Sequence, residues 1–221
     1  MKQTMNRTHR TVCTVLATAA LAASLSACAP LIIGGAVIGG VMAVDRRTAG
    51  TQVEDEGIEL GAINRISAAL GDRAHVNVTS YNRQALLTGE VASAQDRQTV
   101  DQIMLSVENI RSVVNDLAVM PTTSLSQRSN DTFITGKVRA SLVDAQDISA
   151  NSFKVLTERN IVYLMGRVSQ REAQRATDIA RGVSGVTKVV RVFEIVSEEE
   201  LRRIATQPPP VTTDSRPTPG G

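Results

Sequence analysis

Nucleophilic, general-base and metal-ligating chemistry in proteins depends most often on cysteine and histidine, and both are scarce in this chain. The 221 residues include two cysteines, Cys13 and Cys28, and two histidines. No H-E-x-x-H, G-x-S-x-G or phosphate-binding loop occurs. Acidic pairs such as Asp144 and Asp147 fit the solvation of a loop better than general acid–base catalysis. The sequence therefore predicts that the protein is not an enzyme and has no catalytic residues, metal, cofactor or small-molecule substrate.

The first 27 residues have the pattern of an export signal. An apolar stretch at 12–25 is too short to span a bilayer, and it follows a basic segment. The basic residues are Lys2, Arg7 and Arg10. Removal of residues 1–27 would leave His75 as the remaining histidine and would place Cys28 at the new N-terminus.

The residues around that cleavage point resemble the lipobox of bacterial lipoproteins, here Leu25-Ser26-Ala27-Cys28. The resemblance implies that Cys28 carries lipid on its sulfur and on its amino group, and several acyl chains hold a protein firmly to a bilayer. Ala29 stands where an inner-membrane retention signal usually has Asp, which implies sorting to the outer membrane, facing the periplasm. The alternative is an ordinary secretory peptide that happens to have a cysteine near its cleavage site.

Charge and composition exclude some classes of partner. Without residues 1–27 the chain has 21 basic and 22 acidic side chains, so its slightly positive formal charge of +2 does not indicate nucleic-acid binding. A basic aromatic platform for nucleic acid is also missing from the sequence. The chain has no Trp, three Phe and two Tyr. Its core must therefore consist mainly of Val, Ile, Leu and Ala, which suits small mixed α/β units.

Two terminal segments have the composition of irregular chain. Residues 28–50 contain an apolar run, 31–44, interrupted by two glycine pairs, and we expect a lipidated, flexible tether at the membrane surface. Residues 207–221 are rich in proline, lack an apolar period and are predicted to be disordered. A short helix is expected at 198–206, just before this tail, because Ser197 precedes an acidic helical pattern.

The central part of the chain contains an internal repeat. Residues 87–91, Leu-Thr-Gly-Glu-Val, match residues 164–168, Leu-Met-Gly-Arg-Val, at an offset of 77. The segments that follow match at an offset of 76. Upstream, residues 64–70 align with residues 136–142 at an offset of 72, which predicts a longer connection within 143–152 of the second copy.

Each copy has the same order of expected elements. An amphipathic helix comes first, two alternating strands joined by a polar turn follow, and then a second helix and a last strand. Ser93-x-x-Asp96 and Ser169-x-x-Glu172 have the spacing that caps the start of the second helix. We therefore predict an α+β protein with two αββαβ domains, at 51–120 and 131–197, joined by a linker at 121–130. In each domain, two helices should pack on one face of a three-stranded mixed sheet.

This pattern resembles tandem BON domains, in which a glycine stands in the second strand, here Gly89 and Gly166. The lipobox and the segments 45–52 and 130–135 resemble the dual-BON outer-membrane lipoprotein family of Gram-negative bacteria. That family implies a protein that binds anionic phospholipid through its second domain, concentrates at division sites and supports outer-membrane integrity.

The resemblance also implies a set of phospholipid-binding residues. Its apolar positions correspond to Phe133, Val138, Leu142, Val143 and the strand glycine Gly166. Charge supports the second copy independently: residues 52–119 have five basic and ten acidic side chains, whereas residues 131–197 have ten basic and seven acidic. Two basic residues of the first helix of that copy are expected to meet phosphates, Lys137 and Arg139. The alternatives are that Phe133 belongs to the core and that the basic residues are only solvated.

A second hypothesis is a protein-binding scaffold of the cell envelope. The acidic helix of the first copy would recognise an envelope partner through a charge cluster that comprises Glu54, Asp55, Glu56 and Glu59. The same charges also fit simple compensation of a helix N-terminus.

Overall fold

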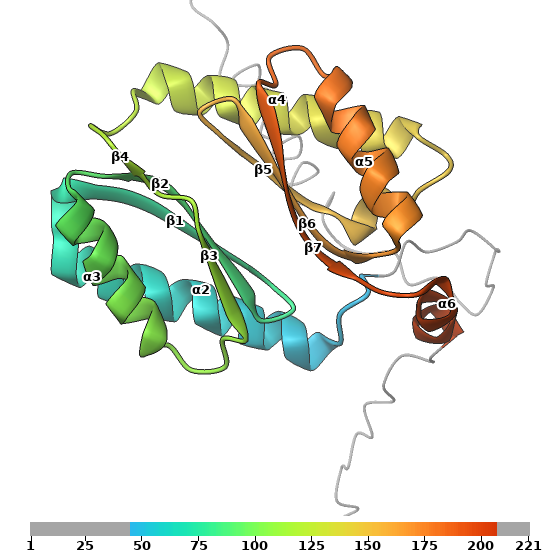
Figure 1. Ribbon diagram of the computed structural model, residues 1–221, viewed down its shortest axis with the longest axis horizontal. Coiled ribbons are helices and arrows are strands. Elements are labelled where there is room, and N and C mark those ends of the chain that lie inside the picture. The colour runs from blue at the N-terminus through green and yellow to red at the C-terminus, as the bar shows by residue number, and fades with distance from the viewer. Residues whose placement is uncertain (1–44, 207–221) are drawn as a thin grey trace, which may run out of the picture. The chain divides into compact units, whose positions relative to one another are not determined.

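The computed structural model describes residues 45–206 (Figure 1). The predicted export signal, Cys28, the apolar run at 31–44 and the proline-rich tail at 207–221 lie outside the described residues. Among the residues described, no helix combines the length and the apolar character that crossing a bilayer requires.

Residues 49–119 form the first module, which has the predicted order helix, hairpin, helix, strand. Its elements are α2 (Ala49–Leu70), the short 3-10 helix η2 (Gly71–Arg73), β1 (Ala74–Tyr81), β2 (Gln84–Val91), α3 (Ala94–Leu105), β3 (Ser112–Asn115) and β4 (Ala118–Val119). The last strand, which we expected to be single, is interrupted at Asp116 and Leu117 and therefore appears as β3 and β4.

Residues 125–195 form the second module with the same order. Its elements are α4 (Leu125–Asp144), the 3-10 helix η3 (Ala150–Ser152), β5 (Lys154–Glu158), β6 (Ile161–Val168), α5 (Gln170–Gly182) and β7 (Lys188–Ile195), followed by α6 (Glu198–Thr206). Helix α4 begins inside the segment predicted as a linker, because Ser124 caps it by accepting a hydrogen bond from the backbone N–H of Gln127. Helix α6 occupies the range expected for a short helix.

Each module has one mixed sheet with the hairpin in antiparallel pairing. Strand β1 pairs antiparallel with β2, and β3 and β4 pair parallel with β2. In the second module β5 pairs antiparallel with β6, and β7 pairs parallel with β6. A parallel return needs a long crossover, which α3 and α5 provide. The fold class predicted from the sequence, two αββαβ modules with mixed sheets, is confirmed.

Local signals explain why the hairpins and second helices form where they do. Both residues of each two-residue hairpin turn, Asn82 and Arg83 or Arg159 and Asn160, have positive φ, as the tight turns of twisted hairpins require. The hydroxyl of Ser169 accepts from the Glu172 backbone while the Glu172 carboxylate accepts from the Ser169 backbone, which is the predicted capping box.

The buried faces of the first helices correct the predicted alignment of the two copies. Helix α2 buries Asp55, Ile58, Ala62, Ile66 and Leu70, and helix α4 buries Asp131, Ile134, Val138 and Leu142. These sets match at an offset of 76, not 72. At this offset α2 extends two residues further than α4 at its C-terminal end, and the hairpins follow at an offset of 77. The connection after the first helix is longer in the second copy, as predicted, with nine residues between α4 and β5 against three between α2 and β1. Only one of these six extra residues is an insertion, because the others replace the end of α2 and the start of β1.

Two apolar cores lie between helices and sheets. In the first module, residues of α2 and α3 pack on alternate residues of β2, Ala85, Leu87 and Val91. In the second, α4 and α5 pack on Val162 and Leu164 of β6 in the same way. The remaining residues of both middle strands point to the opposite face of each sheet. That face is also buried, and the helices stand on the outer sides of the two sheets (Figure 1).

Candidate functional site

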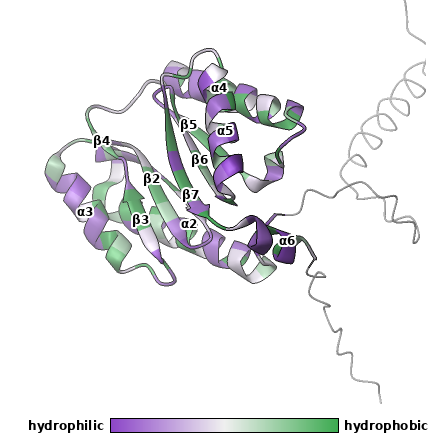
Figure 2. Ribbon diagram, turned by 45° about the vertical axis from the view of Figure 1, so that its right-hand side comes forward, coloured by the Kyte–Doolittle hydropathy of each residue, from purple (hydrophilic) through white to green (hydrophobic). Residues whose placement is uncertain are grey.

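Helix α4 presents an apolar stripe to solvent. Leu125, Phe133 and Val143 are 76%, 66% and 67% exposed. With about 100° of rotation per residue, they lie within about 80° of one another around the helix axis, opposite the buried positions. Ala140 lies on the same side and is exposed. We call this stripe, Leu125, Phe133, Ala140 and Val143, the outer face of α4; Figure 2 shows the mixed hydropathy of the helix.

Two cations flank this outer face. Lys137 and Arg139 each lie about 40° beyond one of its edges. The Lys137 ammonium stands 5.0 Å from the centre of the Phe133 ring and also donates to the hydroxyl of Ser184 at 3.0 Å. Arg139 donates to the carbonyl of Val155 at 3.1 Å. Within the described residues, neither cation has a carboxylate within ion-pair distance. Their charges therefore remain available to an anion.

An open hollow adjoins the C-terminal half of α4. Arg139 and Val143 line it together with Phe153 and Val155 of the second module and with Asp45. A guanidinium next to apolar walls is a combination that suits a lipid phosphate with part of its acyl chain. The carboxylate of Asp45 is held by Arg47 at 2.7 Å and so is partly neutralised.

Three of the residues predicted to bind phospholipid are buried in the second module, although Leu142 also lines the hollow beside α4. Val138 and Leu142 are at most 1% exposed and belong to the core. Gly166 lies in β6, where a Cβ atom would stand 2.4 Å from the backbone oxygen of Ser152. Their burial gives them a role in the packing of the module. The structure brings together on one helix surface the remaining four predicted residues, Phe133, Lys137, Arg139 and Val143.

The sheet faces that lie opposite the helices form a third apolar core between the modules. It contains Tyr81 and Leu86 from the first module and Tyr163, Met165 and Val192 from the second. The Tyr163 hydroxyl donates to Asp116 at 2.7 Å. Burial, with this hydrogen bond and the charge of Asp116, raises the pKa of Tyr163. The sequence analysis did not foresee this packing. Its signal was the run of consecutive apolar residues in both middle strands, which indicates strands buried on two faces.

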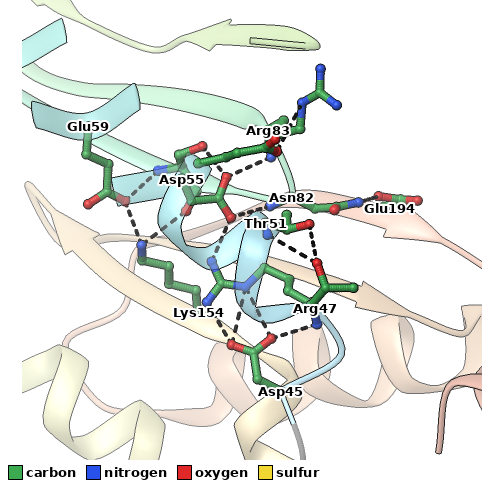
Figure 3. A network of polar contacts seen from close by, with 12 residues as sticks. Asp45, Arg47, Thr51, Asp55, Glu59, Asn82, Arg83, Lys154 and Glu194 are labelled. Carbon is green, nitrogen blue, oxygen red and sulfur yellow. Dashed lines mark hydrogen bonds and ion pairs between the residues drawn. The ribbon is translucent and has the colours of Figure 1, made fainter. Parts of the chain in front are cut away.

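A polar network around Asp55 surrounds this core on one side (Figure 3). The buried carboxylate of Asp55 accepts from the backbone N–H groups of Asn82 and Arg83, from the Ser80 hydroxyl and from Arg47. Burial raises the pKa of Asp55, but these hydrogen bonds lower it more, so its net pKa lies below the ordinary value. Asp131 accepts from the corresponding hairpin turn of the second module in the same way.

The segment that enters the first helix is attached to both modules. Arg46 makes a bidentate ion pair with Glu172 of α5 at 2.7 and 2.8 Å. Arg47 pairs with Asp55 at 2.7 Å and stands 4.4 Å from the centre of the Tyr81 ring. The sequence analysis used these arginines only as part of a family resemblance. Their charges join the N-terminal end of the described chain to the two folded units.

A second polar cluster lies at the opposite end of the interface. Glu90 of β2 is completely buried and accepts from Arg159 of the second module at 3.0 Å and from Thr123. Glu158 of β5 is 5% exposed and accepts from Asn77 of the first module at 2.8 Å. Burial raises the pKa of Glu90, but its hydrogen bonds lower the pKa more, so the net pKa lies below the ordinary value. Burial raises the pKa of Glu158, and the negative charges of Glu90 and Asp131 raise it further.

Comparisons with known proteins agree with the duplicated fold. The BON domain model matches residues 62–121 and 130–197, more than half of the chain. The chain is 36% identical to the outer membrane lipoprotein DolP of Haemophilus influenzae over 172 residues, which cover 77% of this chain and 89% of that protein. It is 32% identical to the 21 kDa hemolysin of Actinobacillus pleuropneumoniae over 69% of this chain and 80% of that protein.

A shorter match concerns one repeat. Osmotically-inducible protein Y of Escherichia coli is 44% identical over 61 residues, 27% of this chain and 30% of that protein. The two family matches, the two αββαβ modules and the identity to DolP over most of both chains support one conclusion. The chain belongs to the BON-domain family.

Proposed function

We propose that this protein is an outer-membrane lipoprotein, acylated at Cys28 and facing the periplasm, whose second BON module binds anionic phospholipid through the outer face of α4. The relation to DolP supports the outer-membrane lipoprotein. The observation that carries the lipid-binding proposal is the exposed Phe133 and Val143 between two cations without carboxylate partners, Lys137 and Arg139.

Physical chemistry gives each of these groups a role at a bilayer. Helix α4, about 30 Å long, would lie in the membrane plane, with Phe133 and Val143 at the boundary between headgroups and acyl chains. Lys137 and Arg139 would meet phosphates, each contributing roughly 1 kcal/mol near an anionic surface. The excess of basic residues in the second module and of acidic residues in the first would orient the protein with the second module toward the membrane.

Bound in this way and anchored at Cys28, the protein would support outer-membrane integrity. The BON-family resemblance of the sequence also suggests a location at division sites. Both statements rest on the lipid contact. If the contact is absent, only the anchor holds the modules near the membrane.

Co-sedimentation with vesicles tests the lipid contact on a form that begins at Asp45 and therefore has no acyl anchor. We expect binding to vesicles that contain phosphatidylglycerol and little binding to pure phosphatidylcholine. Phe133→Ser and Lys137→Glu should each weaken binding about tenfold or more, since about 1.4 kcal/mol corresponds to a factor of ten. Leu105→Ser, which changes an even more exposed apolar residue on α3 of the acidic module, is the control and should bind like the parent protein. Equal binding to both kinds of vesicle would disprove the proposal.

A second candidate, a scaffold that binds an envelope protein, is favoured by one feature of the first module. Helix α2 exposes Val53, Leu60 and Ile63 along one side. Crosslinking in cells from a photoreactive residue at position 60 should capture a defined protein if this surface is a docking site. If no product forms, or if an identical product forms from position 105, the scaffold hypothesis is wrong.

A further inference from the structure

A histidine and two carboxylates meet where the two modules touch. His75 of β1 and Glu90 of β2 are direct partners in the antiparallel hairpin, and Glu158 reaches them from β5 of the second module. One ligand-type atom from each lies within 4.8 Å of the other two. His75 is the only histidine among the described residues. Sequence motifs do not reveal this cluster, because its members are 15 and 68 residues apart and belong to different repeats.

We propose that His75, Glu90 and Glu158 form a binding site for a divalent transition-metal ion, with Zn²⁺ the best match, that links the first module to the second. Imidazole nitrogen and carboxylate oxygen are ligands that zinc accepts, and three protein ligands leave a fourth position for water. Imidazole makes Ca²⁺ and Mg²⁺ poor candidates, since both prefer oxygen ligands alone.

Charge supports a cation in this place. Glu90 and Glu158 are both buried, and the ion pair with Arg159 neutralises only one of the two negative charges. Asp131 adds a third buried carboxylate nearby, but the hairpin backbone satisfies its oxygens. A buried, uncompensated carboxylate is unfavourable. A divalent ion would supply the missing positive charge.

The distances fit a tetrahedral zinc ion after a small adjustment of one side chain. His75 Nδ1 and Glu90 Oε2 are 3.2 Å apart. Two ligands at about 2.0–2.1 Å from a tetrahedral zinc ion are about 3.3 Å apart, so these two atoms already have the required separation. Rotation of the Glu158 side chain would close the remaining gap. The His75 side chain is 23% exposed, which gives an ion a route from solvent.

Neighbouring groups hold the carboxylates as outer-shell groups do in metal sites. Arg159 binds the other oxygen of Glu90 and the carbonyl of Gly89, and so leaves Glu90 Oε2 facing the histidine. The backbone N–H and the hydroxyl of Thr123 also donate to Glu90 Oε2, at 3.2 and 3.3 Å. When a metal ion binds, these two hydrogen bonds would either remain beside the metal bond or break. Asn77 donates to one oxygen of Glu158, and the other oxygen can turn toward the metal.

The repeat provides an internal argument for a single site. By the hairpin pairings, the equivalents of His75, Glu90 and Glu158 in the opposite modules are Ser152, Arg167 and Tyr81. This trio has no imidazole and no carboxylate, so it cannot form a second copy of the site. We therefore expect one metal ion per chain.

Calorimetric titration with ZnCl₂ tests this inference on the full chain in detergent. The parent for the titration carries Cys13→Ala, Cys28→Ala and His9→Ala, which removes the competing ligands outside the described residues. We expect one Zn²⁺ per chain and a rise in the unfolding temperature when Zn²⁺ is added. Calcium at the same concentration should bind at least 100-fold more weakly.

Variants assign the ligands. His75→Ala and Glu158→Gln should each weaken Zn²⁺ binding at least 100-fold and abolish the rise in unfolding temperature. Glu56→Gln makes the same chemical change at an exposed position of α2 and is the matched control, with binding unchanged. If a ligand variant does not fold, NMR of the single imidazole in the parent decides: Zn²⁺ should shift or broaden the His75 ring signals. Absence of binding, or equally tight binding by His75→Ala, would overturn the proposal.

Discussion

At the scale of single residues, the two modules use the same device to fix their hairpins. Asp55 and Asp131 stand one helical turn before the first buried aliphatic residue of their helices, and each accepts two backbone N–H groups from the turn of its own hairpin. A buried carboxylate with this many donors is worth more than an exposed ion pair, because the donors would otherwise be unpaired. The sequence analysis assigned Asp55 to a charge cluster and missed this role, since a helix-to-turn contact across 27 residues leaves no local pattern.

Asp55→Asn should therefore reduce the free energy of unfolding by about 3 kcal/mol at neutral pH, because an amide cannot accept from all four donors. The pKa of Asp55 lies below its ordinary value in the folded state, so unfolding at acid pH takes up a proton. The stability that this group contributes is complete above the ordinary pKa of about 3.9 and is lost as pH falls from there toward the folded value.

Urea denaturation at a series of pH values from about 7 down to 3 measures both effects. Asp55→Asn should have a lower midpoint at pH 7 and a flatter acid limb than the parent protein. Glu56→Gln, at the next and exposed position, should behave like the parent. An unchanged acid limb in Asp55→Asn would show that this carboxylate does not cause the acid sensitivity.

At the scale of elements, most of the secondary structure followed from local patterns. Alternating apolar residues, polar turns and Ser-x-x-acid caps located the hairpins, α3 and α5. The alignment of the first helices was wrong by one turn, because an amphipathic pattern shifted by four residues still matches itself. The start of α4 at Leu125 was also missed. Residues 125–130 form the N-terminal end of α4, and none of them is buried, so no apolar period predicts a helix there.

Two glycines, one in a strand and one in a helix, make an element-scale prediction with opposite signs. Gly166→Ala places a Cβ atom 2.4 Å from the Ser152 backbone oxygen and should destabilise the protein by about 1–3 kcal/mol. Gly57→Ala, in α2 with no heavy atom within 4 Å of the added Cβ, should stabilise it by about 0.5–1 kcal/mol. Thermal unfolding of the two variants checks the pair. Equal effects would mean that the close approach in β6 is not the reason for glycine there.

At the scale of the whole described chain, the buried interface between the two modules leads us to expect that they unfold as one unit. The sequence analysis left their packing open, because it did not use the consecutive apolar residues of β2 and β6, which indicate strands buried on both faces. Buried apolar side chains from both sheets form the centre of this interface. Two ion pairs cross it, Lys154–Glu59 and Arg111–Glu194. Arg46 and Arg47 bind one module each, through Glu172 and Asp55.

Calorimetry can separate coupled from independent modules. We expect one cooperative unfolding transition for the parent protein. Leu86→Glu puts a charge on the interface side of β2 and leaves the helix side intact, so it should give two transitions and lower the first by about 10 °C, as expected for a loss of about 4 kcal/mol. Leu105→Glu, at a 79% exposed position of α3, should keep one transition. Two transitions in the parent protein would refute the coupling.

The contact between α4 and an anionic bilayer is tested most directly at Phe133 itself. Because the chain has no tryptophan, Phe133→Trp introduces a single fluorescent reporter on the outer face of α4, and Leu105→Trp introduces the same reporter on the first module. With vesicles that contain phosphatidylglycerol, emission from position 133 should shift to shorter wavelength and become protected from an aqueous quencher, while emission from position 105 stays unchanged. Unchanged emission at position 133, or an equal shift at position 105, would contradict membrane binding through this helix.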